Sequence, residues 1–427
     1  MNKKPRKLYN YYFFKKIVYL MLFFLLLTPS IRIAPSLPLI RLEEMTIVIV
    51  VAFLFIRLMR NKEIVLAWSL RQLLFSGLFV VVAISIFIGS MLGFDASIAD
   101  FNQFIRVFKY LIIYSATLTL FKISQDPQEE KYNLLKYYLI LSSVLFFVSI
   151  QQYFNLFALN ELYVPTIAPT QYETLVNNYP FPRPVGLVGN PNELGMLFVL
   201  GSLVSLFLLL KSFRISILII FFFQVGGLFL TLSRGALVAF VIGLIILLLK
   251  LFFDNFHKIK LAGIMRFFIL FLTASLSMVY VVYNTSFIDT IFWRFARLSN
   301  LESDTSWQAR ILHWQENLNL FKESPFIGVG PLRRATFEYA ADNEWLLLLR
   351  SYGIIGTVYI FTIFFIPHLL NKRSIFNILS LVILLSSSIY MIPAAVFHSL
   401  VLMPVVLILI SVSEEKTKLI SIRRDIY

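Results

Sequence analysis

The chain lacks cysteine, and only 14% of its 427 residues are charged. Without cysteine, a disulfide framework and a cysteine-ligated metal site are both excluded. The four His residues are scattered without metal-binding spacing, and neither a Gly-rich nucleotide loop nor a Ser/His/Asp arrangement is present, so no metal or cofactor is expected. A content of 59% hydrophobic residues excludes a soluble enzyme, because soluble domains are less apolar and more charged.

Long apolar runs are present instead, and they predict an all-α polytopic membrane protein that forms a single domain over residues 1–427. A helix needs about 20 apolar residues to cross the hydrocarbon core of a bilayer. Twelve such spans are expected, near 13–30, 43–59, 72–93, 103–121, 134–157, 190–210, 214–232, 235–253, 262–283, 344–370, 375–392 and 394–412.

The positions of Lys and Arg predict that both termini lie in the cytoplasm, because cytoplasmic loops are enriched in basic residues. This bias also accounts for the net charge of +15, so no nucleic acid partner is expected. Eleven of the thirteen basic residues assigned to the outside are Arg. Since Arg binds phosphate and carboxylate in a bidentate manner, the bias favours an outer face that handles anions over a chance distribution.

Two outer loops are long. Residues 158–185 contain five prolines and are expected to be stiff and extended. Residues 284–343, between the ninth and tenth spans, form a large periplasmic loop in which 305–322 has the pattern of an amphipathic helix. This helix either lies at the membrane–water interface on the outer side or packs over the bundle. In both arrangements Arg310 and His313 face a water-filled space.

The first motif runs from Arg183 through Gly186 and continues as Asn190-Pro191-Asn192-Glu193. Asn190 is a suitable N-cap and Pro191 suits the first helical position, so a helix begins here with its partial positive charge directed outward. An adjacent Arg183 makes this terminus a candidate anion site. The alternative is a well-capped helix with an Arg that reaches the interface.

Three further motifs lie on the outer side: Thr231-Leu232-Ser233-Arg234-Gly235, then Glu323 to Pro331, then Asp342-Asn343 with Gly353 and Gly356. In the tight turn between two spans, Arg234 stays at the membrane surface either as an anion-binding residue or as an interfacial anchor. Asp342 and Asn343 precede a span, and taken alone they are better explained as helix caps.

In order, these motifs resemble the bacterial O-antigen polymerase and O-antigen ligase superfamily, over about Arg183 to Thr357. The resemblance implies metal-independent transfer of a glycan from undecaprenyl diphosphate at the periplasmic face of the inner membrane. In its ligase-like members, the last motif begins with a His that helps to activate the acceptor hydroxyl. The chain has Asp342 at that position. This difference weakens the assignment as a lipid A-core ligase and favours a repeat-unit polymerase.

The expected function is therefore an O-antigen or surface polysaccharide polymerase, a glycosyltransferase that joins undecaprenyl diphosphate-linked oligosaccharide repeat units to an acceptor glycan. Its expected catalytic residues are Asp342, as base, with His313 or Glu344 as a substitute, and Arg234. Its expected substrate-binding residues are Arg183, Arg310, His313, Asn190, Asn192 and Asn343. The lipid bilayer and a chain-length regulator protein are the other candidate partners.

Three alternatives stay open: an O-antigen ligase, a protein O-oligosaccharyltransferase, and a flippase or transporter of lipid-linked oligosaccharides. The scarcity of ionisable residues within the spans argues against the transporter class. A structural subunit of an envelope assembly complex is a weaker possibility still. The sequence does not specify the sugar or the linkage.

Overall fold

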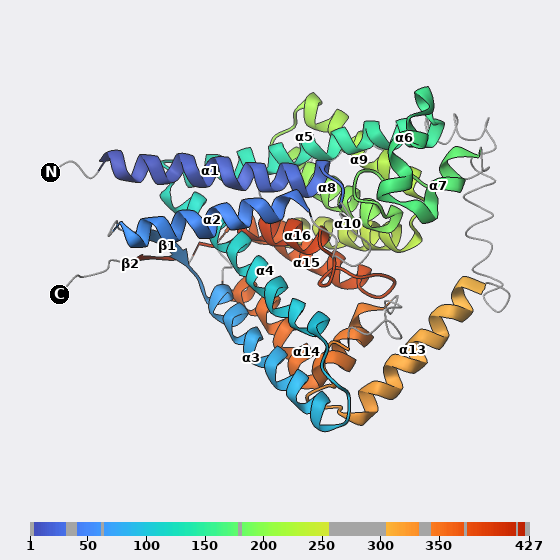
Figure 1. Ribbon diagram of the computed structural model, residues 1–427. Coiled ribbons are helices and arrows are strands. Elements are labelled where there is room, and N and C mark those ends of the chain that lie inside the picture. The colour runs from blue at the N-terminus through green and yellow to red at the C-terminus, as the bar shows by residue number, and fades with distance from the viewer. Residues whose placement is uncertain are drawn as a thin grey trace, which may run out of the picture.

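The protein is a bundle of helices that run back and forth between two ends of the molecule (Figure 1). The computed structural model describes residues 4–30, 41–60, 64–177, 182–255, 305–332, 343–370, 374–415 and 417–422. The helices of the bundle are α1 (Lys4–Leu27), α2 (Leu42–Met59), α3 (Leu70–Met91), α4 (Ile98–Ile123), α5 (Pro127–Phe154), α8 (Pro191–Lys211), α9 (Ile215–Thr231), α10 (Arg234–Asn255), α14 (Glu344–Leu370), α15 (Asn377–Tyr390) and α16 (Leu402–Ser411).

A helix lies at every expected span except 262–283, which falls outside the described residues. Within the described part of the chain, six helices are long and apolar enough to cross a membrane. The all-α membrane class is therefore confirmed, while the number of twelve spans and their orientation stay predictions. The last expected span, 394–412, is shorter in the structure, since only Leu402–Ser411 is helical.

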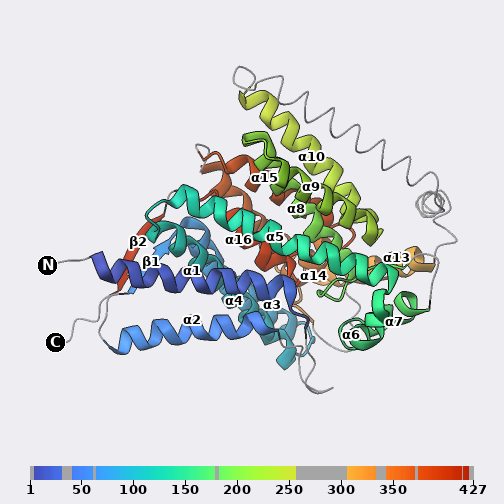
Figure 2. The same cartoon turned by 90° about the horizontal axis from the view of Figure 1, so that it is seen from above.

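A small antiparallel sheet closes one end of the bundle. Strand β1 (Ile64–Trp68) pairs with β2 (Lys418–Ile422). The sheet places the connection between α2 and α3 beside the C-terminal segment, and Figures 1 and 2 show both chain termini at this same end. We refer to it as the inner end and to the opposite end as the outer end.

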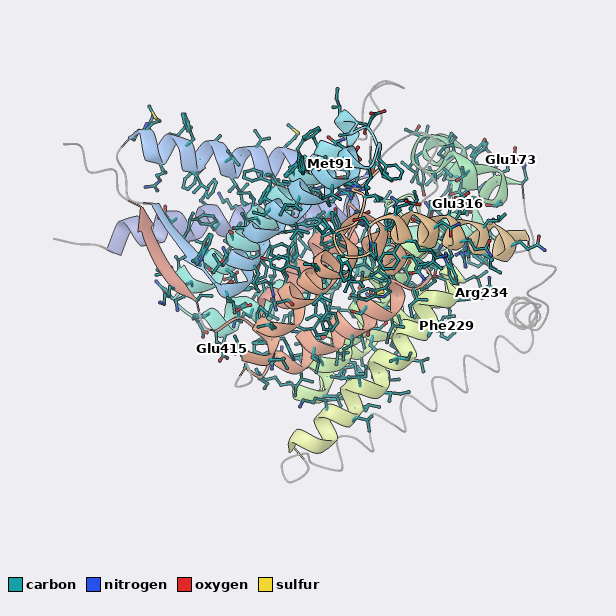
Figure 3. The ribbon with its side chains drawn as sticks, turned by 90° about the horizontal axis from the view of Figure 1, so that it is seen from below. Met91, Glu173, Phe229, Arg234, Glu316 and Glu415 are labelled. Carbon is teal, nitrogen blue, oxygen red and sulfur yellow. The ribbon has the colours of Figure 1, made fainter. Side chains whose placement is uncertain are left out.

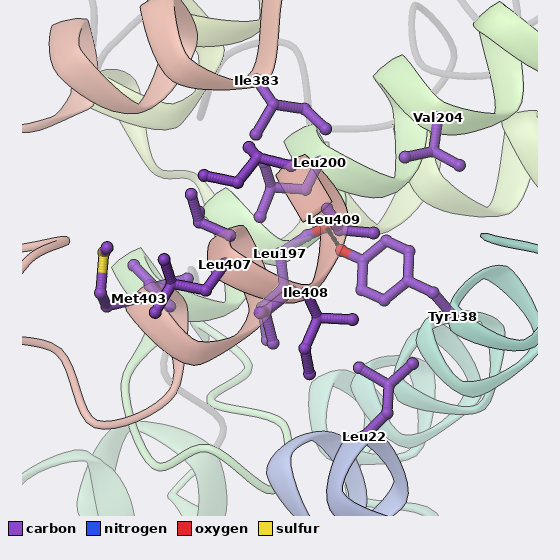
Figure 4. Close-up of a cluster of buried hydrophobic side chains, with 14 of the residues drawn as sticks. Leu22, Tyr138, Leu197, Leu200, Val204, Ile383, Met403, Leu407, Ile408 and Leu409 are labelled. Carbon is purple, nitrogen blue, oxygen red and sulfur yellow. Dashed lines mark hydrogen bonds between the residues drawn. The ribbon is translucent and has the colours of Figure 1, made fainter. Parts of the chain in front are cut away.

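Helix α8 forms the centre of the core and is buried along nearly its whole length. Helices α9, α10 and α15 pack around it (Figure 2). Figure 4 shows Leu197, Leu200 and Val204 of α8 among side chains from α1, α5, α15 and α16, and the Tyr138 hydroxyl of α5 donates a 2.7 Å hydrogen bond to the Leu197 carbonyl. A helix this completely enclosed gives its first residues a fixed position at the outer end.

Helix α14 is broken at Gly353, where φ is 63° and ψ is −171°. The turn that follows α13 (Thr305–Glu323) enters this break. There, the Val329 N–H donates to the Arg350 carbonyl at 2.9 Å and the Ile355 N–H donates to the Phe326 carbonyl at 3.0 Å. A Cβ at position 353 would overlap the Phe326 carbonyl group. The glycine therefore allows two backbone segments to pair, which joins the third motif to the fourth.

Residues 158–185 are not extended as expected. They contain α6 (Leu159–Ile167) and α7 (Pro169–Val176), preceded by the 3₁₀ turn η1 (Leu156–Ala158). Pro169 is the first residue of α7, where the missing N–H costs nothing, so this proline starts a helix. Asn160 then stabilises the pair, because its side-chain amide donates to the carbonyls of Gln152 and Leu175.

We expect Gly353→Ala to destabilise the protein more than Gly93→Ala. Both glycines have a positive φ, so each substitution carries a backbone cost of about 1–2 kcal/mol. At Gly353 the new Cβ would also overlap backbone, whereas nothing lies within 4 Å at Gly93. Such overpacking costs about 1–3 kcal/mol more. Thermal unfolding in detergent measures the difference, and equal shifts in Tm would contradict the role assigned to Gly353.

Candidate functional site

Arg183 connects three parts of the chain at the outer end. Its Nε donates to the Thr231 carbonyl at 3.0 Å, and its Nη2 donates to Asn192 Oδ1 at 2.7 Å. Thr231 ends α9 and Asn192 lies in the first turn of α8. The guanidinium is partly buried, so these bonds hold it in a defined position rather than leaving it as a mobile surface charge.

Arg234 begins α10, directly after the turn that Arg183 contacts. This turn lies close against α8 because residue 195 is glycine: a Cβ there would be 2.9 Å from Thr231 Oγ1 and 3.0 Å from Ser233 Cβ. The Arg234 side chain is partly buried, and within the described residues its guanidinium has no hydrogen-bond or ion-pair partner. Figure 3 shows Arg234 at the same end as Glu173 and Glu316, opposite Glu415.

Asn190 is the N-cap of α8. Its Oδ1 accepts hydrogen bonds from the N–H groups of Asn192 (2.8 Å) and Glu193 (3.3 Å), and Pro191 is the first helical residue, as predicted. The N-terminus of α10 lies next to it at the same end. Each helix N-terminus carries a partial positive charge, so both helices add to the positive potential around the two Arg residues.

A carboxyl group lies in the first turn of α8. The Glu193 carboxyl interacts with the Ser399 hydroxyl and lies within electrostatic reach of Arg41 and Glu344. The buried Tyr390 hydroxyl, at the end of α15, lies within electrostatic range of Glu193, Arg183 and Glu344. Segment 391–401, which connects α15 to α16, is therefore part of the same site, together with the starts of α8, α10 and α14.

Glu344, the first residue of α14, is fully buried and holds this segment. Its Oε2 accepts the N–H groups of Val396 and of Phe397 (2.7 Å), and its Oε1 accepts the N–H of His398 (2.7 Å) and its ring Nδ1 (2.8 Å). Sequence reasoning offered Glu344 as a substitute base. With four donors on its carboxylate, it instead fixes the segment and orients the His398 ring.

A second buried charge group closes the site on the side of α2 and α4. Arg41 donates to both oxygens of Glu43 (3.0 and 3.2 Å), and Lys109 Nζ lies 2.8 Å from Glu43 Oε1. Arg41 also donates to the carbonyls of Leu25 and Thr28 at the end of α1. These opposite charges offset one another, as buried charges require.

The other expected site residues have separate positions. Asn343 caps α14 by accepting the Leu346 N–H at 3.2 Å, and Asp342 falls outside the described residues. Arg310 and His313 lie on α13, where the His313 ring is 3.5 Å from Glu316 of the same helix. The structure brings Arg183, Asn190, Asn192 and Arg234 together, whereas Arg310 and His313 lie on a separate helix.

The amphipathic helix expected at 305–322 is present as α13, which packs against α14. Ile311 and Leu318 of its apolar stripe are 38% and 41% exposed. Contact with the bundle thus leaves part of the stripe uncovered. The insertion of α13 into the membrane–water interface on the outer side stays a prediction.

Part of the chain is similar to a known protein family. Residues 219–361, about a third of the chain, match the family model described as O-antigen ligase. Over this segment the chain is therefore similar to the O-antigen polymerase and ligase superfamily. The matched segment contains Arg234, Arg310, His313, Asp342 and Asn343. Arg183 lies outside it and joins the site through its contact with Thr231. No curated protein matches the chain.

Sequence reasoning missed Arg41, Tyr390 and His398 as members of the site. Each is brought by the fold alone to the group formed by Arg183, Asn192, Glu193 and Arg234, which we call the Arg183 group, and none belongs to a motif with recognisable spacing. The signal that pointed to Glu344 was its place next to Asn343, but a capping role explained that position equally well. Only the three-dimensional structure shows that segment 391–401 contacts several parts of the site.

We expect Asn192→Ala to lower activity by releasing Arg183 Nη2, whereas Asn190→Ser leaves activity intact because Ser is also a good N-cap. Asn190→Ala removes the cap and lowers the free energy of unfolding by about 1 kcal/mol. Glycan synthesis and thermal unfolding, measured on all three variants, separate the two roles. A loss of activity in Asn190→Ser, or none in Asn192→Ala, would contradict the assignment.

Proposed function

We propose that the protein is a polymerase of O-antigen or another surface polysaccharide. It transfers an oligosaccharide repeat unit from undecaprenyl diphosphate to a sugar hydroxyl of an acceptor glycan, at the periplasmic face of the inner membrane. The observation that carries the proposal is the contact of Arg183 with the turn that bears Arg234, beside the N-termini of α8 and α10. Family members are glycosyltransferase-like polymerases and ligases.

The chemistry of the transfer requires positive charge at this place. The acceptor oxygen bonds to the anomeric carbon, the bond from that carbon to the diphosphate breaks, and the diphosphate gains negative charge as it leaves. Preorganised cations stabilise that charge in the transition state without having to reorient. Arg183 is held by two hydrogen bonds, Arg234 is fixed at a helix start, and the helix dipoles add to both.

A transporter is less well supported by the same geometry. A flippase needs a charged path that extends between the two faces of the membrane. The charges of the Arg183 group instead gather at the outer end, and the buried inner-end pair of Arg71 and Glu414 (3.3 Å) is occupied with Tyr114 and with carbonyls of α14. Charge at one end suits a surface reaction.

An O-antigen ligase is the second candidate, because the matching family model carries that description. The polymerase is preferred since Asp342 stands where ligase-like relatives have His. Glycans of a deletion strain distinguish the two. Single repeat units on lipid A-core indicate a lost polymerase, whereas polymer left on the lipid carrier indicates a lost ligase.

We expect Arg234→Ala to lower kcat/KM by about 100- to 1,000-fold, which corresponds to the loss of one preorganised donor to a developing anion. Folding should be unaffected, because this guanidinium has no partner in the described part of the chain. Arg234→Lys should rescue poorly, since the bidentate fork is lost. Formation of glycosidic bonds by purified protein from a lipid-linked donor is the measurement.

Arg214→Ala is the matched control, since Arg214 is an exposed arginine at the opposite end, before α9. It should retain full activity. An active Arg234→Ala variant would remove the proposed anion site. Movement of the donor across the membrane by wild-type protein, without new glycosidic bonds, would favour the flippase.

A further inference from the structure

His398 lies in segment 391–401 at the outer end, and its side chain is only 6% exposed. Its ring Nδ1 is 2.8 Å from Glu344 Oε1, and Glu344 is fully buried. The backbone N–H of His398 donates to the same oxygen at 2.7 Å. Two bonds to one oxygen fix both the backbone and the ring plane of this histidine.

The partner of Nδ1 decides where the ring can accept a proton. An ionised carboxylate only accepts hydrogen bonds, so Nδ1 carries the hydrogen that it donates to Glu344. In the neutral ring the lone pair is then on Nε2. Three backbone N–H groups donate to the same carboxyl group, and a negative charge beside Nδ1 stabilises the imidazolium that forms when Nε2 takes a proton.

The residues on both sides of His398 are held by neighbouring helices. Ser399 interacts with Glu193 in the first turn of α8. The Tyr110 hydroxyl of α4 donates to the Phe397 carbonyl at 2.5 Å. His398 is therefore held between α4, α8 and α14, at the same end as the cations assigned to the diphosphate.

We propose that His398 is the catalytic base, which takes the proton from the acceptor hydroxyl, and that Glu344 is its positioning residue. The proposal rests on the proposed glycosyl transfer. As the acceptor oxygen bonds to the anomeric carbon, its proton passes to Nε2 of His398. The electron pair of the broken carbon–oxygen bond leaves with the diphosphate, and the imidazolium later returns its proton to water.

This assignment accounts for the Asp at position 342. A histidine that reaches the site from the connection between α15 and α16 supplies the group that the last motif lacks. It also accounts for the ring contact to Glu344. Three backbone N–H groups already satisfy the carboxylate and hold the segment, so anchoring alone does not require an imidazole.

The test is His398→Asn, whose amide keeps a donor for Glu344 but has no basic nitrogen. We expect kcat/KM to fall about 100- to 10,000-fold, as for loss of a general base, with little change in KM for the donor or in Tm. His368→Asn is the matched control, because His368 is a buried histidine near the inner end of α14. It should keep full activity.

Rescue separates a base from a structural side chain. In His398→Ala, added imidazoles of similar size but different pKa should restore the rate in proportion to their basicity. Restoration that depends on size alone, or full activity in His398→Asn, would overturn the proposal.

The pH dependence adds a readout that needs no variant. The charged or titratable groups facing this segment are Glu344 from α14, Glu193 from α8, Tyr110 from α4, Tyr390 from α15, and Arg183 and Arg41. Among these groups a histidine ordinarily loses its proton near neutral pH. Wild-type kcat/KM should rise with pH as the base loses its proton, and a kcat/KM that falls as the pH rises would overturn the proposal even if the variants fail to fold.

Failure of this inference is distinguishable from failure of the proposed function. Wild-type protein that forms no glycosidic bond from any lipid-linked donor contradicts the proposed function itself. Wild-type protein that forms the bond, together with an equally active His398→Asn variant, contradicts only the role of His398.

Discussion

The hydrogen bonds of the Arg183 guanidinium determine the arrangement of the whole outer end. One bond reaches the last carbonyl of α9 and the other reaches the first turn of α8, so a residue in an irregular segment joins two helices of the core. The close packing that this requires is possible because Gly195 has no side chain to separate α8 from the turn. Arg234 is brought to the same place as a consequence, since it follows that turn directly.

Fixed positions explain why these two cations are suited to an anion. Buried charges at the outer end are held by partners within the protein, as Arg41 and Lys109 are by Glu43 and as Glu344 is by segment 391–401. Burial without such partners would be costly. A departing diphosphate requires positive charge that is already in place, and the partial positive charges at the starts of α8 and α10 add to that of Arg183 and Arg234.

The helices could be predicted from the sequence because each is a long apolar run, and the N-cap at Asn190 because capping is local. Residues 158–185 were wrongly expected to be extended, since proline was weighed as a helix breaker when Pro169 in fact starts α7. The only sequence signal for the contact between Arg183 and Thr231 was that both residues belong to motifs expected on the outer side. Glu344 and His398 are 54 residues apart in the chain, and no sequence signal linked them. Pairing of this kind is decided by packing, which no local pattern encodes.

The most direct test of the shared anion site is an experimental structure of the protein with undecaprenyl diphosphate bound. The account predicts that the diphosphate lies between Arg183 and Arg234 at the N-terminus of α8, with both guanidinium groups bonded to its oxygens. A diphosphate bound elsewhere, or one that contacts neither arginine, would contradict it.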